Sequence, residues 1–320
     1  MFLDFYQHIP EYINPIAFSI GFFSIRWYSL MYLVGLGVVY FLLKQSIIRK
    51  KLSGKQFSIF PPEADQPRAG NFPAYAKASA GKQFSINFQF SNDQFQKLFL
   101  YIFIGILIGG RLGYVLFYDL TYFIQNPLEI FLPLNIKACY MLHATCYSGF
   151  CGMSYHGGLI GAILAGIIFA GKYKINFWKL ADWVASAAPA GYFFGRVGNF
   201  LNNELYGRMT DMPWGMYFSG QLRHPSQLYE AFFEGIVLFL ILCLVSGSLK
   251  NKYSKYYFPG FLFSIYLFGY GLFRFILEFF REPDTQIGFI FSFLTMGQIL
   301  SIGMIALAVI IFWKKDKKIL

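Results

Sequence analysis

The chain has 320 residues, of which 56% are hydrophobic, 21% are aromatic and only 13% are charged. Such a chain cannot keep its apolar side chains out of water on every side, so the composition excludes an ordinary water-soluble domain and indicates a lipid bilayer as the solvent. The formal net charge of +11 would suit a nucleic-acid-binding protein, but the basic residues are distributed in a way that argues against that class.

Taken in chain order, about seven apolar runs reach or approach the roughly 20 residues that a helix needs to cross a hydrocarbon core. We therefore predict an all-α, polytopic transmembrane bundle that forms a single domain over residues 1–320. One run contains Pro189 and several glycines, so we expect that helix to be interrupted or partly buried. The predicted spans are 17–43, 98–118, 157–171, 180–200, 230–248, 258–280 and 289–313.

The basic residues mark one side of a membrane. Nineteen of the 27 lysines and arginines fall in alternate connections and in the C-terminal tail, namely residues 44–97, 172–179, 250–255 and 314–318. The positive-inside rule places these segments in the cytoplasm and the N-terminus outside. The same rule puts outside the segments 119–156, 201–229 and 281–288. The first run is too long for a cleaved signal peptide, so we expect it to be retained.

Residues 54–86 differ in composition from the spans around them. The segment is rich in Gly, Ala, Ser, Pro and Lys, and the hexapeptide GKQFSI at 54–59 recurs at 81–86. We interpret it as an acquired insertion that forms a disordered cytoplasmic loop without a catalytic role. The cysteines have no metal-type spacing; Cys139, Cys146 and Cys151 lie in an outward segment, where they form a disulfide or remain unpaired thiols.

The segment GRVGNFLNNELYG, residues 195–207, is unusually polar for the outer end of a span. If it is helical, Arg196 and Asn199 lie three residues apart on one face and offer a planar cationic fork and an amide to the same group. A phosphate at the membrane surface would suit that pair. The alternative is that Arg196 only extends to the interface as an anchor.

A second polar stripe ends the sixth predicted span. In FRFILEFFREPD, residues Arg274, Glu278 and Arg281 have the spacing i, i+4 and i+7, which places them on one helical face. One glutamate neutralises only one of the two arginines, so an anionic ligand could balance the other. A buried ion-pair ladder that holds helices in register is the alternative.

His156 lies in MSYHGG at the outer start of the third predicted span. A helix N-terminus disfavours imidazolium, so a neutral ring there could accept a proton from a thiol as a general base. An interfacial histidine without a chemical role is the alternative. Three weaker motifs are RWYSLMY with Arg26 and Tyr28, GGRLGYVLFY with Arg111, and RHPSQLYE, in which Pro225 fits a helix start. No phosphate-binding loop, nucleophile elbow or zinc-protease motif occurs in the sequence.

Taken together, these motifs resemble the prolipoprotein diacylglyceryl transferase family, in the same order and nearly end to end. The resemblance does not cover 54–86 or a stretch near 137–150, and Asn203 stands where the family commonly has glycine before Glu204. It implies a seven-helix enzyme of the bacterial inner membrane whose active site faces the periplasm. The motif positions that it implies are functional are Tyr28, His156, Arg196, Asn199, Glu204, Gly207, Arg274 and Glu278.

The resemblance also implies the reaction. The thiol of a preprolipoprotein lipobox cysteine would displace the phosphate-bearing group of phosphatidylglycerol, giving a thioether and glycerol 1-phosphate. We expect His156, Arg196 and Arg274 to be catalytic. We expect Arg196 also to bind substrate, together with the remaining positions and Arg281. No metal or other cofactor is implied, because the lipid itself carries the leaving group. A transporter or binding protein for anionic lipid is the alternative function, although the two halves of the sequence show no internal symmetry.

Overall fold

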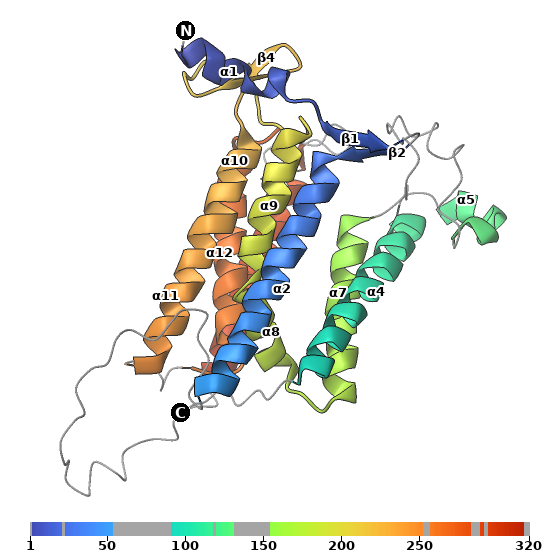
Figure 1. Cartoon of the computed structure of the whole chain (residues 1–320), viewed down its shortest axis with the longest axis vertical. Helices are drawn as coiled ribbons and strands as arrows, with labels where there is room; N and C mark the ends of the chain where they lie inside the picture. The colour runs from blue at the N-terminus through green and yellow to red at the C-terminus, as the bar shows by residue number, and fades with distance from the viewer. Residues whose placement is uncertain are drawn as a thin grey trace, which may run out of the picture. The chain divides into compact units, whose positions relative to one another are not determined.

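A computed structural model describes the chain over residues 2–20, 23–53, 91–117, 120–130, 154–251, 257–282, 289–290 and 294–316 (Figure 1). The predicted insertion 54–86 and the three cysteines Cys139, Cys146 and Cys151 lie outside these residues. The chain divides into two compact units. The larger comprises Met1–Ser19, Ile25–Asn87 and Ala181–Leu320, and the smaller comprises Ile20–Ser24 and Phe88–Leu180.

Helices dominate both units. Four helical stretches are long and apolar enough to cross a membrane, and these are Trp27–Ile48, Asn92–Leu116, Ser226–Ser246 and Met296–Lys314. Two shorter apolar helices cover Gly157–Lys172 and Phe261–Leu277. These stretches agree with the predicted class, a helical membrane protein.

The larger unit contains most of the helices. After the N-terminal α1 and the long α2, the chain returns through α9, runs through the consecutive elements α10, η2 and α11, and ends with α12 and α13. Their bounds are α1 (Phe2–Tyr12), α2 (Trp27–Ser53), α9 (Ala188–Leu201), α10 (Ser226–Glu230), the π-helix η2 (Ala231–Val237), α11 (Leu238–Asn251), α12 (Phe261–Leu277) and α13 (Met296–Asp316). Helix α8 (Phe177–Ala185) precedes α9.

Three predicted spans differ in detail from the helices. The seventh was expected to begin at residue 289, but residues 289–290 and 294–295 form short strands and the helix begins at Met296. The first was expected to begin at residue 17, but residues 16–20 and 23–26 form the short strands β1 (Ile16–Ile20) and β2 (Phe23–Arg26). Their apolar residues alternate with smaller or polar ones, which is the strand period rather than the helical one. In the 180–200 run the helix is interrupted at residues 186–187, and Pro189 lies in the first turn of α9, as expected for a proline.

The smaller unit is built on a close pair of helices, α4 (Asn92–Phe117) and α7 (Tyr155–Lys172). A methyl group added to Gly109 would lie 2.4 Å from the carbonyl oxygen of Gly157, and one added to Gly161 would lie 2.0 Å from that of Gly105. The backbones therefore touch through these glycines, whose lack of a side chain lets the two helices approach closely. The short elements α5 (Leu120–Gln125) and η1 (Pro127–Ile130) follow α4.

The larger unit also carries small sheets at one end. Strand β3 (Met216–Phe218) pairs antiparallel with β4 (Gln221–Arg223), so that Met216 faces Arg223. The two turn residues Ser219 and Gly220 both have positive φ, which suits a two-residue hairpin. Strands β5 (Phe289–Ile290) and β6 (Leu294–Thr295) pair antiparallel just before α13. Helix α1 packs on β3 through an apolar cluster around Phe200, Met216 and Phe218.

A buried aspartate fixes the start of α12. The carboxylate of Asp182 in α8 accepts hydrogen bonds from the hydroxyl of Tyr257 at 2.5 Å, from the amide of Gly260 at 2.8 Å and from the amide of Phe263 at 2.9 Å. Helix N-termini leave amide groups without partners inside the helix, so this carboxylate caps α12. Because α12 carries Arg274 at its other end, the cap contributes to the placement of the site.

Candidate active site

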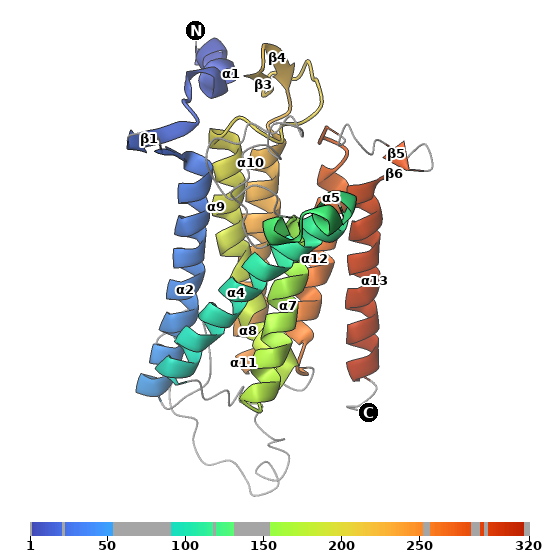
Figure 2. The same cartoon turned by 90° about the vertical axis from the view of Figure 1, so that its right-hand side faces the viewer.

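The polar residues of the larger unit gather where several helix ends meet. The C-terminal ends of α9 and α12 lie beside the start of α10, on the same side as α1 and β4 (Figures 1 and 2). The sequence segments 195–207, 223–230 and 273–282 therefore come together in space, although each lies far from the others along the chain.

Glu230, the last residue of α10, lies at the centre of this meeting point. Its side chain is almost completely buried, with 2% exposed. One carboxylate oxygen, Oε1, lies 2.7 Å from Nη1 of Arg274 and 3.7 Å from Nη1 of Arg281. The other, Oε2, lies 2.8 Å from Nε of Arg196. A single carboxylate thus faces three arginines that come from two other segments.

Glu278 completes the ion pairs on α12. Its Oε2 lies 2.9 Å from Nη2 of Arg274, as the predicted i, i+4 spacing requires. Its Oε1 accepts a hydrogen bond from the hydroxyl of Thr295 at 3.1 Å, and a methyl group added to Gly297 would lie 2.6 Å from this oxygen. The stripe was expected to keep one arginine without a protein carboxylate. That expectation was incomplete, because Glu230 from α10 provides a second carboxylate.

Arg196 is oriented by its own helix and by α10. Its Nη1 donates to Oδ1 of Asn199 at 3.3 Å, which confirms that the two side chains share a helical face. Its Nε donates to the hydroxyl of Tyr192 at 2.7 Å, one turn earlier on α9. Together with Glu230, Tyr192 thus occupies the Nε edge of the guanidinium. Of the guanidinium predicted to bind a phosphate, only the edge formed by the two Nη atoms therefore faces away from these partners.

The loop after α9 continues the polar network. Nδ2 of Asn199 donates to Oε1 of Glu204 at 2.8 Å, and the side-chain amide of Gln227 donates to the Glu204 carbonyl oxygen at 2.7 Å. Asn203 has φ of 54°, a left-handed conformation that glycine adopts most easily and that asparagine tolerates better than most residues. Asparagine at position 203 can therefore adopt the left-handed backbone conformation that glycine would adopt there.

Gly207 lies where three segments cross. Its amide donates to the carbonyl oxygen of His224 at 2.8 Å, and it forms a bridge with Arg281. A methyl group added to Gly207 would lie 2.4 Å from the carbonyl oxygen of Phe280 and 2.7 Å from that of His224. Glycine is thus needed for close backbone approach at this crossing.

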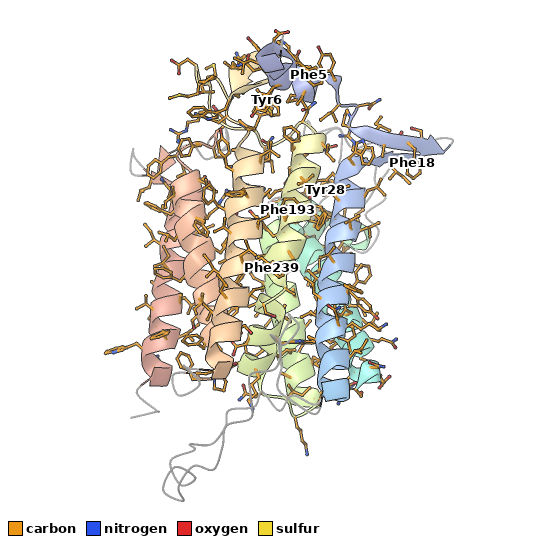
Figure 3. The ribbon with its side chains drawn as sticks, turned by 60° about the vertical axis from the view of Figure 1, so that its left-hand side comes forward. Phe5, Tyr6, Phe18, Tyr28, Phe193 and Phe239 are labelled. Atoms are coloured by element: carbon orange, nitrogen blue, oxygen red, sulfur yellow. The ribbon has the colours of Figure 1, made fainter. Side chains whose placement is uncertain are left out.

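Tyr28 lies near the start of α2, on the same side as α1 (Figure 3). Its ring lies 4.5 Å from that of Tyr32, and Gly198 of α9 approaches its backbone closely. Nearby, Nη1 of Arg26 lies 3.5 Å from Oδ1 of Asn202, at the end of α9. Tyr28 is therefore held beside the helix that carries Arg196.

Other predicted residues have different surroundings. His156 lies in the first turn of α7 in the smaller unit, and its side chain is outside those that the structure describes. Arg111 donates to the carbonyl oxygens of Glu129 at 2.5 Å and Ile130 at 3.0 Å, so it ties η1 to α4. Pro225 immediately precedes α10, as its motif predicted.

His224 lies beside the segment that follows α9, because its carbonyl oxygen accepts a hydrogen bond from the amide of Gly207. The ring of His224 packs edge-on against Phe280 with centroids 5.2 Å apart, and Nδ1 lies 3.2 Å from the hydroxyl of Tyr229. Burial lowers the pKa of His224 below its ordinary value, because the charged form loses solvation. The imidazole is accordingly neutral near pH 7.

Several site residues were not predicted individually. Gln227 and Glu230 belong to the motif RHPSQLYE but had no predicted role, and Tyr192 and Glu234 lie outside the predicted motifs. Glu230 and Glu234 are almost completely buried. A usable signal was present, because two acidic residues four apart within the first turns of an apolar span are costly and generally functional.

Apolar helices together with a buried cluster of three arginines and two glutamates define a helical membrane protein with a site suited to an anionic group. Residues 73–314 match the family model described as prolipoprotein diacylglyceryl transferase. The chain therefore belongs to the prolipoprotein diacylglyceryl transferase family.

Individual relatives agree with this assignment, and each is named phosphatidylglycerol–prolipoprotein diacylglyceryl transferase. The protein of Chlorobaculum tepidum is 42% identical over 99% of this chain and 95% of its own length. That of Campylobacter jejuni is 40% identical over 97% of this chain and 96% of its own. That of Wolinella succinogenes is 46% identical over 70% of this chain and 77% of its own.

Proposed function

We propose that this protein transfers the diacylglyceryl group of phosphatidylglycerol to the lipobox cysteine of a preprolipoprotein, the first step of bacterial lipoprotein maturation. The observation that carries the proposal is the arrangement of Arg196, Arg274 and Arg281 around Glu230. The direct ion pairs join three guanidinium groups to two carboxylates and therefore carry one positive charge in excess, which suits an anionic group such as a phosphodiester in the membrane.

The reaction forms one bond and breaks one bond at a glycerol carbon. The cysteine sulfur attacks the carbon that carries the phosphate, and the carbon–oxygen bond to that phosphate breaks. The electron pair leaves with the phosphate oxygen, giving glycerol 1-phosphate, and the thiol proton passes to a base. Fixed donors that meet the growing charge on the leaving group lower the barrier, and this is the role proposed for Arg196 and Arg274.

The other site residues have supporting roles in this proposal. His156 is the proposed general base for the thiol. Asn199 and Glu204 shape the loop beside Arg196, and Glu278 and Arg281 adjust the charge around Arg274. Tyr28 and Gly207 border the same region and are proposed to contact substrate. No metal or cofactor is required by this chemistry.

We further propose that the chain crosses the inner membrane about seven times, with the N-terminus periplasmic, the C-terminus cytoplasmic and the site toward the periplasm. The arrangement of the larger unit supports this orientation. Lysines occur in the last turns of α2, α11 and α13. Arg196 and Arg274 lie in the C-terminal halves of α9 and α12, and these two helices run in the opposite direction (Figure 2). By the positive-inside rule, the lysine-bearing end is cytoplasmic.

The test uses the purified protein in vesicles that contain phosphatidylglycerol, together with a peptide that carries a lipobox cysteine. We expect a lipidated peptide and an equal amount of released glycerol 1-phosphate. Vesicles of phosphatidylcholine alone and a peptide with cysteine replaced by serine are the controls. Tight binding of phosphatidylglycerol without either product would refute the transferase and support an anionic-lipid-binding protein instead.

A further inference from the structure

Beneath the ion pairs lies a second polar layer that the proposed chemistry does not use. Tyr192 precedes Arg196 by four residues on α9, Tyr270 precedes Arg274 by four residues on α12, and Glu234 follows Glu230 by four residues. Because residues four apart lie one above the other on a helix, each member of the charged cluster has a partner one turn deeper in the bundle.

These deeper residues contact one another. The hydroxyl of Tyr192 and Oε2 of Glu234 are hydrogen-bonded. The ring of Tyr192 meets that of Tyr270 edge-on, with centroids 5.5 Å apart and an interplanar angle of 88°. Tyr192 is therefore held in place by α12 through its ring and by η2 through its hydroxyl.

Tyr192 is also the direct neighbour of Arg196. Its hydroxyl accepts the Nε hydrogen bond at 2.7 Å, and its ring centroid lies 4.9 Å from Cζ of the guanidinium. A tyrosine hydroxyl has one hydrogen to donate. With that hydrogen given to Glu234, the oxygen lone pairs face Arg196, so the three groups form a directed chain of hydrogen bonds.

Glu234 has no other evident purpose among the described residues. Its side chain is completely buried, no arginine or lysine lies within ion-pair distance, and its Oε1 has no hydrogen-bond partner there. Burying a carboxyl group with so few partners is costly. The observation is explained if Glu234 serves to fix the hydroxyl of Tyr192.

We propose that Tyr192 and Glu234 are positioning residues, which lock the Nε edge of Arg196 so that its two Nη atoms face the phosphate of the substrate. This inference rests on the proposed function, since it assumes that Arg196 binds the phosphate of phosphatidylglycerol. In this proposal Glu234 accepts the hydrogen bond from the hydroxyl of Tyr192, and neither residue contacts the substrate.

The first experiment removes only the hydroxyl. For Tyr192→Phe we expect a fall in kcat/KM for phosphatidylglycerol of about tenfold, the scale of one hydrogen bond to a charged group. We also expect a lower melting temperature, because the buried carboxyl group of Glu234 loses its partner. Tyr101→Phe is the matched control, because the hydroxyl of Tyr101 also accepts from a cation, Lys172 at 2.8 Å, but on α4 in the smaller unit. We expect that variant to retain wild-type activity.

A double-mutant cycle separates positioning from a general structural effect. If Tyr192 acts only through the guanidinium of Arg196, then Tyr192→Phe should cause little further loss in an Arg196→Lys protein. Glu234→Gln, which keeps an acceptor oxygen, should retain most activity. Glu234→Leu should lose as much as Tyr192→Phe, and combining the two should add little. If Glu234→Leu does not fold, Tyr192→Phe and the Arg196 cycle still decide the question.

Two results would overturn the inference. One is activity of Tyr192→Phe within about twofold of wild type, below the size of a hydrogen bond to an ion. The other is a loss that multiplies fully with that of Arg196→Lys. The melting temperature is also measured with phosphatidylglycerol and with phosphatidylcholine. A wild-type protein that is selectively stabilised by phosphatidylglycerol yet forms no product would refute the transferase. In that case the positioning is tested by the same Tyr192 and Arg196 variants, with the rise in melting temperature caused by phosphatidylglycerol measured in place of activity.

Discussion

The carboxylate of Glu230 lies between Arg196 and Arg274, 2.8 Å from Nε of the first and 2.7 Å from Nη1 of the second. These two arginines belong to different helices, so the carboxylate joins α9 to α12 as well as balancing charge. A buried ion pair is weak evidence for stability in itself, but the loss of one partner leaves the other charges uncompensated.

We therefore expect Glu230→Gln to destabilise the protein by about 3–5 kcal/mol, the usual cost of breaking a buried pair, and to abolish most activity. Thermal unfolding of the purified protein and the lipidation assay measure the two effects. Glu282→Gln is the control, since Glu282 is 46% exposed and pairs with Arg223 at 3.1 Å. It should change stability by less than about 1 kcal/mol. Equal effects of the two substitutions would contradict the central role of Glu230.

Arg196→Lys distinguishes a phosphate-binding fork from a membrane anchor. Lysine keeps the charge but cannot offer two parallel donors, so we expect a loss of at least about tenfold in transfer with normal expression and membrane insertion. Arg26→Lys is the matched control and should stay near wild type, because Arg26 is the last residue of β2, immediately before α2. Activity of Arg196→Lys within about twofold of wild type, roughly 0.4 kcal/mol, would make Arg196 an anchor.

His156→Ala tests the proposed general base through the pH dependence of its effect. A thiol ionises by itself near its pKa of about 8.5, and a base is then no longer needed. The ratio of wild-type to mutant rate should therefore be large at pH 6 and small at pH 9. His224→Gln is the control, and any loss that it causes should be constant over this range. A constant ratio for His156→Ala would assign it a positioning role.

Gly207→Ala tests the crossing of the three site segments. The added methyl would lie 2.4 Å from the Phe280 carbonyl oxygen, so the backbone must shift, at a cost of about 1–3 kcal/mol. Melting temperature and transfer should both fall. Gly303→Ala in α13 is the matched control, because nothing lies within 4 Å of the added methyl, and it should be neutral or slightly stabilising. A Gly207→Ala protein as stable as Gly303→Ala would refute the steric explanation.

Helical spacing allowed the local parts of the site to be predicted. Arg196 and Asn199, three residues apart, are hydrogen-bonded, and Arg274 and Glu278, four apart, form an ion pair. Spacing along one helix carries no information about a partner on another helix. The approach of Glu230 to both arginines depends on how the helices pack, so it could not be read from the motifs.

The same limit applies to the start of the first span. Mean hydropathy is high over residues 17–26, but hydropathy alone does not distinguish a strand from a helix in a short apolar run. The alternating pattern of IAFSI and FSIR was the available signal for strands. By contrast, Pro189 restricts the backbone directly, so the interruption of the 180–200 run was predictable.

The π-helix Ala231–Val237 separates two stretches that have different tasks. Glu230, just before it, belongs to the ion pairs, whereas Leu238 and Leu242, just after it, belong to an apolar cluster with Tyr257 and Leu262. A π turn accommodates one residue more than an α turn. The segment can therefore lose a residue by becoming an ordinary α-helix, and both flanking faces keep their directions. A change of one residue in chain length can be absorbed within this segment, without turning Glu230 away from the ion pairs or Leu238 away from the apolar cluster.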